Sequence, residues 1–237
     1  MGHELMRRTR AGKGVKLAGM SPKSFLLSDE IHAYLMAHSA PIDGVAQRLI
    51  DRTQALGDVA GMQVAPEQGL LLTLLTRIIG ARIAIEVGTF TGYSALCIAR
   101  GLAEGGRLFC CDVSEEWTSI GQQAWTEAGV ADRIDLRIAP AAETLRALPA
   151  DPVIDLAFVD ADKGGYATYV EELVPRLRPG GILMLDNTLW SGRVIDAEDE
   201  EPNLVAIRAV NDQVAADSRL TTVLLPISDG MTLSIRN

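Results

Sequence analysis

Two kinds of segment in this chain carry residue types that could do chemistry: a glycine loop and acidic strand ends. The loop lies in Glu86–Ser94 (EVGTFTGYS), where Gly88 and Gly92 follow an apolar run. Glycine allows a ligand to approach the backbone closely, and ligands of open α/β sheets bind beyond the carboxyl ends of strands. The spacing differs from the dinucleotide fingerprint G-x-G-x-x-G, so it predicts a nucleotide-like ligand without identifying it. A tight turn with no ligand is the alternative.

Two carboxylates lie close to this loop in the predicted fold. Asp112 ends the second predicted strand. A carboxylate there can accept hydrogen bonds from both ribose hydroxyls, and capping of the following helix is the alternative. Glu86 ends an otherwise apolar strand. A buried carboxylate needs a partner, which a cationic or amino-bearing ligand would supply.

Hard oxygen donors end the fourth and fifth predicted strands. Asp160 follows the fourth strand, and Asp186 and Asn187 end the fifth. Because parallel strands end at one edge of a sheet, these three side chains could meet at one point. Two carboxylates and an amide oxygen suit Mg2+ or Ca2+. Acidic residues that only cap helices are the alternative.

Lys163 and Trp190 flank this trio. Lys163 is the one plausible base, since the three histidines lie before the predicted sheet: His3, His32 and His38. Burial can lower the pKa of a lysine, whereas a surface lysine paired with Asp162 is the alternative. Trp190 could wall an aromatic substrate or could pack within its own loop.

Alternating strands and helices position these segments. Apolar runs predict five strands, Ile83–Val87, Arg107–Cys111, Ile134–Ile138, Ile154–Val159 and Gly181–Leu185, then an antiparallel pair, Leu220–Leu225 and Met231–Ile235. Helices are predicted from a Ser28 cap to Ala37 and at Asp43–Leu56, Glu67–Gly80, Thr91–Leu102, Glu115–Ala128, Glu143–Leu148, Ala167–Leu177 and Leu204–Ala216. The pattern predicts an α/β fold, with a parallel sheet covered on both faces.

Composition excludes several classes of protein. The chain has 237 residues, is 48% apolar and carries a net charge of −9, which is typical of a soluble globular domain and not of a nucleic-acid-binding protein. No apolar run reaches the roughly 18 residues of a membrane span. Residues 1–20 are basic and are interpreted as a flexible leader or an added segment before one domain over 21–237. A basic arm that touches RNA or membrane is the alternative.

The cysteines and one acidic run point to structure more than to chemistry. Cys110 and Cys111 are adjacent, so they should face opposite sides of a strand and form no disulfide. With no CxxC pair, zinc is unsupported, and a reducing cytoplasm is the predicted setting. The run Asp196–Glu201 (DAEDEE) predicts a solvated loop, with a second metal site as the alternative.

In their order and spacing, three motifs resemble the caffeoyl-CoA / catechol O-methyltransferase family of class I S-adenosylmethionine enzymes. They are Glu86–Ser94, Phe158–Lys163 (FVDADK) and Asp186–Gly192 (DNTLWSG). The resemblance runs from about Ser21 to the C-terminus and includes Met62–Gly69 (MQVAPEQG) and Ser228–Thr232 (SDGMT). It implies a Rossmann-like, seven-stranded, mostly parallel sheet with an antiparallel last strand, extra N-terminal helices and, usually, a homodimer.

The resemblance also implies roles for individual residues. Cofactor binding falls to Met62, Val64, Glu86, Gly88, Thr89, Phe90, Ser94, Asp112, Ala141 and Asp160. Asp160, Asp186 and Asn187 would hold Mg2+ (or Ca2+ or Mn2+). Lys163 and Asp160 would be catalytic, and the phenolic substrate would contact Lys23, Lys163 and Trp190.

One departure from the family pattern concerns the substrate. Catechol-specific members carry a carboxylate on the late strand where this chain has Val223-Leu224-Leu225. The difference places the chain nearer the bacterial and plant branch. The second hydroxyl of the phenol must then be held in another way.

The predicted activity is cation-dependent transfer of a methyl group from S-adenosylmethionine to a hydroxyl of a vicinal diphenol, with no nucleic-acid or membrane partner. A nicotinamide-dependent oxidoreductase is one alternative, but the middle glycine of its loop is missing. A non-catalytic binding domain is the other, although it would not need Asp160, Lys163, Asp186 and Asn187 together. The sequence leaves open the acceptor and the choice between meta and para hydroxyls.

Overall fold

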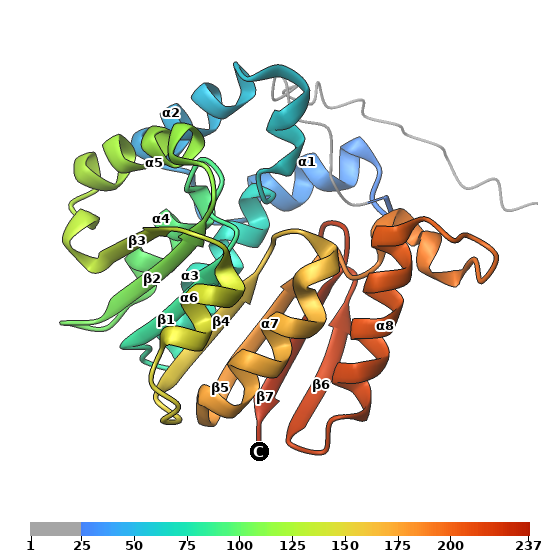
Figure 1. The fold of residues 1–237 in the computed structure, drawn as a ribbon. Coiled ribbons are helices and arrows are strands. Elements are labelled where there is room, and N and C mark those ends of the chain that lie inside the picture. Colours follow the sequence, from blue (N-terminus) through green and yellow to red (C-terminus); the bar gives the residue numbers. More distant parts are fainter. Residues whose placement is uncertain (1–24) are drawn as a thin grey trace, which may run out of the picture.

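One seven-stranded sheet, in the order β3-β2-β1-β4-β5-β7-β6, forms the centre of the computed structural model, which describes residues 25–237 (Figure 1). The strands are β1 (Ile83–Val87), β2 (Arg107–Asp112), β3 (Ile134–Ile138), β4 (Ile154–Val159), β5 (Leu177–Asp186), β6 (Leu220–Leu225) and β7 (Met231–Arg236). Strands β1 to β5 pair in parallel, and β7 runs antiparallel to both β5 and β6. The predicted seven-stranded Rossmann-like sheet with an antiparallel last strand is confirmed.

Helices cover both faces of this sheet (Figure 1). Helices α2 (Gly44–Gln54), α3 (Pro66–Ile78), α4 (Tyr93–Gly101) and α5 (Glu115–Glu127) pack on one face, around Leu108 and Phe158. Helices α6 (Ala141–Ala147), α7 (Tyr166–Leu173) and α8 (Pro202–Ala216) cover the other, around Val87 and Leu185. Both faces of the central strands are therefore buried, which explains their continuous apolar sequences.

Local sequence signals account for most helix starts. Ser28 caps α1 (Asp29–Ala37) through a hydrogen bond that its hydroxyl accepts from Ile31, and Asp43 caps α2 in the same way. Side-chain oxygens at these positions satisfy N–H groups that have no partner within the helix. Short 3-10 turns complete the chain at η1 (Gly57–Met62), η2 (Ala131–Arg133), η3 (Lys163–Gly165), η4 (Val174–Arg176) and η5 (Trp190–Ile195).

The predicted helix over Ala167–Leu177 is wrong at its end. Helix α7 stops at Leu173, the turn η4 contains Pro175, and Leu177 is already the first residue of β5, paired with Ile154. Proline lacks the N–H that a helix interior requires, so the helix cannot continue through it. The early part of β5 was missed because Pro179, Gly180 and Gly181 interrupt its apolar pattern.

Two further expectations concern the ends of the chain and the membrane. The predicted leader over residues 1–20 and the substrate-contacting Lys23 lie outside the described residues. Within residues 25–237, no helix is long and apolar enough to cross a bilayer.

Candidate active site

A cavity of about 940 Å³ opens at the carboxyl ends of β1, β2, β4 and β5. The order of the strands reverses between β1 and β4, and ligands of open α/β sheets bind at such a point. Most of the predicted site residues line this cavity: Met62, Val64, Gly88, Thr89, Phe90, Ser94, Asp112, Ala141, Asp160, Lys163, Asp186, Asn187 and Trp190. Glu86 lies fully buried at the end of β1 and is not part of the lining.

Gly88 is required where the ends of β1 and β4 meet. Its φ of 87° is in the left-handed region, and a Cβ atom there would collide with the carbonyl oxygen of Asp160. The N–H of Asp160 in turn donates to the carbonyl of Val87, 2.8 Å away. The glycine loop and the first acidic strand end are therefore in direct backbone contact.

Asp112 organises the glycine loop. Its Oδ2 accepts hydrogen bonds from the N–H groups of Thr89 and Phe90, both at 2.8 Å, and its Oδ1 accepts one from Ser114. Ser114, and not Asp112, caps α5, so the capping alternative is wrong. Each carboxylate oxygen offers about two acceptor sites, so Oδ2 is filled and Oδ1 keeps one site for a ribose hydroxyl.

Glu86 is a buried acid without a hydrogen-bond partner. Its side chain is fully buried, and neither carboxylate oxygen has a partner among the described residues. Burial raises the pKa of Glu86 from 4.5 to about 7, although the nearby Ser94 and Thr89 hydroxyls act in the opposite direction. A buried polar group in this state is costly, which marks it as a site for a ligand donor.

The ends of β4 and β5 bring two carboxylates together. Asp186 is buried, and burial, followed by the charge of Asp160, raises its pKa to about 7. Its Oδ1 accepts a hydrogen bond from the N–H of Asn187 at 2.8 Å. Asn187 has a φ of 57°, a left-handed conformation that asparagine tolerates better than most residues. Asp160, Asp186 and Asn187 thus all line the cavity.

Lys163 is a buried part of this group. Only 8% of the residue is exposed, and its Nζ lies 3.2 Å from Asp160 Oδ1 and 2.7 Å from the hydroxyl of Tyr166. Asp162 instead accepts a hydrogen bond from Tyr169 at 2.6 Å. The alternative of a surface lysine paired with Asp162 is therefore wrong.

Trp190 begins a tightly bent segment beside the cavity. Trp190, Ser191 and Gly192 have φ values of 46°, 53° and 80°. The carboxylate of Asp229 accepts a hydrogen bond from the N–H of Ser191, and Asn211 donates to the carbonyl of Thr188 at 2.8 Å. Sequence reasoning missed Asp229, which also lines the cavity, although it lies within the resembling stretch Ser228–Thr232.

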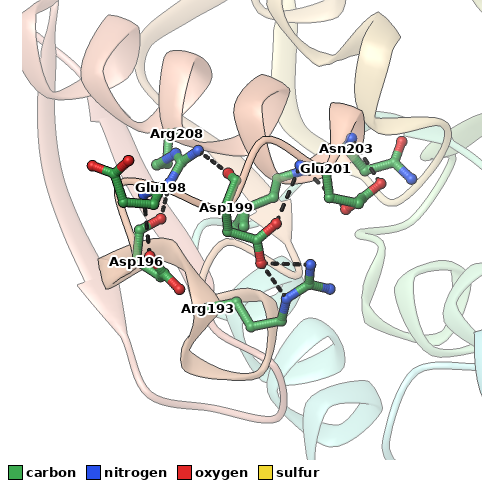
Figure 2. A network of polar contacts seen from close by, with 8 residues as sticks. Arg193, Asp196, Glu198, Asp199, Glu201, Asn203 and Arg208 are labelled. Carbon is green, nitrogen blue, oxygen red and sulfur yellow. Dashed lines mark hydrogen bonds and ion pairs between the residues drawn. The ribbon is translucent and has the colours of Figure 1, made fainter.

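The acidic run after this segment is an ordered network (Figure 2). Asp199 accepts hydrogen bonds from Arg193 at 2.9 and 2.6 Å, and Arg208 donates to the backbone carbonyls of Asp196 and Asp199. Glu201 caps α8. The predicted solvated loop is confirmed, because residues 196–201 form no helix or strand and most are exposed, and arginines outside the acidic run hold it in place. No group of three or more His, Cys, Asp or Glu side chains in the described part of the chain is arranged as a metal site.

The prediction that Cys110 and Cys111 face opposite sides of a strand and form no disulfide is confirmed. Cys97, Cys110 and Cys111 are all buried and free. Cys110 packs in the core on one face of β2, whereas Cys111 lines the cavity.

Comparison with known proteins identifies the family. An O-methyltransferase family model matches residues 36–237, most of the chain. The chain belongs to the O-methyltransferase family. It is 41% identical over 210 residues to a probable caffeoyl-CoA O-methyltransferase 2 of Dictyostelium discoideum, covering 87% of this chain and 91% of that protein.

Solved structures agree with this assignment. An O-methyltransferase from Bacillus cereus in complex with SAH has a TM-score of 0.81 and 30% identity, covering 88% of this chain and 97% of that one. The O-methyltransferase TomG from Streptomyces achromogenes, in complex with SAM, has a TM-score of 0.80 and 26% identity, covering 88% and 96%. The chain is an S-adenosylmethionine-dependent O-methyltransferase, and the oxidoreductase and binding-domain alternatives are not favoured. Its place in a bacterial branch stays a prediction.

Proposed function

We propose that this enzyme transfers the methyl group of S-adenosylmethionine to one hydroxyl of a vicinal diphenol, with a divalent cation held by Asp160, Asp186 and Asn187. One observation carries the proposal. The two carboxylates, the amide and Lys163 line the same cavity as the glycine loop, so a methyl donor and a polar acceptor fit side by side.

The residues at the strand ends fit a hard divalent cation such as Mg2+. Asp160 lies close enough to the buried Asp186 for its charge to raise the pKa of that carboxyl, and a cation between them would relieve the repulsion. Carboxylate and amide oxygens are the ligands that Mg2+ and Ca2+ prefer. A bound cation would supply Lewis-acid chemistry that lowers the pKa of an acceptor hydroxyl.

The other half of the cavity fits the cofactor. The buried carboxylate of Glu86 has no partner among residues 25–237, and the amino group of the methionine part would provide one. Asp112 would take the ribose hydroxyls, and its Oδ1 keeps one free acceptor site for them. Gly88, Thr89, Phe90 and Ser94 would surround the methionine part, Met62 and Val64 would cover the cofactor, and Ala141 would lie beside the adenine.

Lys163 and Trp190 act on the acceptor in this proposal. As a neutral amine Lys163 accepts the proton of the reacting hydroxyl, and as an ammonium group paired with Asp160 it stabilises the phenolate. Trp190 forms a wall for the aromatic ring. The phenolate oxygen attacks the sulfonium methyl in line, a bond from carbon to oxygen forms, and the neutral thioether leaves. Holding both reactants at one sheet edge supplies much of the rate gain.

The identity of the acceptor is open within this class. The relative in Dictyostelium carries the name of a caffeoyl-CoA enzyme, and free catechols, flavonoids and related diphenols fit the same chemistry. A homodimer, a cytoplasmic setting and a contact from Lys23 also remain predictions.

A screen of vicinal diphenols with labelled S-adenosylmethionine tests the proposal. We expect transfer with Mg2+, loss of transfer in a chelator and recovery when Mg2+ is added back. Matched monophenols, which lack the second hydroxyl, serve as controls and should react poorly. Full turnover of diphenols in the chelator would contradict the role of the cation, while calorimetry with S-adenosylhomocysteine shows separately whether the cofactor site is intact.

A further inference from the structure

The hydroxyl of Tyr166 touches three parts of the proposed site at once. Tyr166 is fully buried at the start of α7. Its hydroxyl lies 2.7 Å from Lys163 Nζ, 3.2 Å from the carbonyl oxygen of Asp186 and 3.3 Å from that of Val159. It therefore connects the turn η3 with the ends of β4 and β5.

The direction of these hydrogen bonds is fixed by chemistry. A protonated lysine can only donate, so the phenol oxygen accepts from Lys163. The single phenol proton must then go to one of the two carbonyl oxygens, on Val159 or Asp186. Val159 directly precedes Asp160, so both carbonyls belong to the strand ends that carry the acids. The phenol oxygen therefore accepts from the lysine while its proton goes to one of the two strand ends.

We propose that Tyr166 is a positioning residue that aims the ammonium of Lys163 at the acceptor. This inference rests on the proposed function, because it requires Lys163 and the two acids to be the reacting groups. In the described structure the other hydrogen-bond partner of Lys163 is Asp160, at 3.2 Å. Without the hydroxyl, the ammonium would pair more fully with Asp160 and compete with a cation for that carboxylate.

A purely structural role is the competing explanation. The ring of Tyr166 is part of the apolar core on the α7 face of the sheet. Replacing Tyr166 by phenylalanine keeps the ring and removes only the hydroxyl, so it separates packing from positioning. Tyr169→Phe is a matched comparison, since it removes a hydroxyl from the same helix whose partner is Asp162 and not Lys163.

A double-mutant cycle with Lys163 tests the inference. We expect Tyr166→Phe to lower kcat by about 10- to 100-fold, the range found for groups that orient a ligand residue. The Kd for S-adenosylhomocysteine should stay within about twofold, and the affinity for Mg2+, measured by calorimetry, should fall several-fold. Tyr169→Phe should lower kcat less. Rates are normalised to the concentration of S-adenosylhomocysteine-binding sites, so partial unfolding does not imitate the effect.

The cycle distinguishes failure of this inference from failure of the proposed function. If Tyr166 acts through Lys163, Tyr166→Phe changes kcat little in a Lys163→Met background. The positioning role would be overturned if the double variant lost kcat by the product of the two single losses. It would also be overturned if the Tyr166→Phe enzyme kept its kcat and its affinity for Mg2+. A Lys163→Met enzyme with full activity would instead overturn the catalytic role of the lysine itself.

Discussion

Carboxylates gather in two regions of this enzyme, and their surroundings differ. In the segment 196–201, a hydrogen bond from Arg193 lowers the pKa of Asp199, and Glu201 accepts hydrogen bonds from the first N–H groups of α8 (Figure 2). At the cavity, burial raises the pKa values of Glu86 and Asp186 to about 7. Asp199 and Glu201 are paired within the protein, whereas Glu86 has no hydrogen-bond partner among the described residues.

The difference shows that charge density alone is a poor guide to chemistry. The DAEDEE run has more acids in sequence than either strand end, yet its Asp199 carboxylate pairs with Arg193 and its backbone carbonyls accept hydrogen bonds from Arg208. The acids at the cavity sit singly at the ends of apolar strands, where burying them costs stability. Perturbed acids in a cavity are typical of functional sites, because the cost is recovered when a ligand binds.

The largest expected effect on activity comes from replacing an aspartate by asparagine at the cavity, and the same replacement in the segment 196–201 is the comparison. Asp186→Asn should lower kcat/KM by at least about 100-fold, since it removes one of the two proposed anionic ligands of the cation. Stability should be retained, because the neutral amide is isosteric and no longer faces a like charge on Asp160. Initial rates with Mg2+ and a thermal unfolding midpoint measure the two effects. An active Asp186→Asn enzyme would remove the main support for the cation.

The second-largest effect is expected at Glu86 and is a change in the free energy of unfolding. Its pKa in the folded protein, about 7, lies above its ordinary value of 4.5, so the folded state holds the proton more tightly between these pH values. The contribution of Glu86 to the free energy of unfolding is therefore lost as pH rises through that window. Glu86→Gln should gain up to about 3 kcal/mol relative to the wild type between pH 4.5 and 7.

Urea denaturation of both proteins without cofactor measures this difference. The other buried acids of the described residues, Asp155 and Asp186, are present in both proteins, so subtraction isolates Glu86. If the free energies of unfolding of wild type and Glu86→Gln changed in parallel across this pH range, Glu86 would not make the predicted pH-dependent contribution to stability.

The smallest effect is expected in the paired region. Asp199→Asn should leave kcat/KM within about twofold, because Asp199 contacts Arg193 and neighbouring backbone and does not line the cavity. The same assay used for Asp186→Asn provides the measurement. A large loss of activity would mean that the network controls the segment that carries Trp190, and the contrast between the two regions would then fail.

Sequence patterns predicted the strands and their order along the chain, and most of the predicted site residues line the cavity, because apolar runs and the residues at their ends are local signals. The pairing of Asp199 with Arg193 and the contacts of Arg208 were not predictable, since they depend on how η5 folds back toward α8. The role of Tyr166 was also hidden. Its hydroxyl contacts backbone carbonyl oxygens, which every residue type provides, so the types of the side chains give no sign of these contacts.

The contact between Gly88 and Asp160 has a further consequence for how this enzyme can change. The glycine loop and the end of β4, which hold the methyl donor and the acceptor in the proposed reaction, meet at a contact that leaves no room for a side chain at position 88. We therefore expect new acceptors to be accommodated away from this contact, for example at Trp190 and Ser191, which also line the cavity. Substrate range and methyl transfer can then diverge independently within one fold.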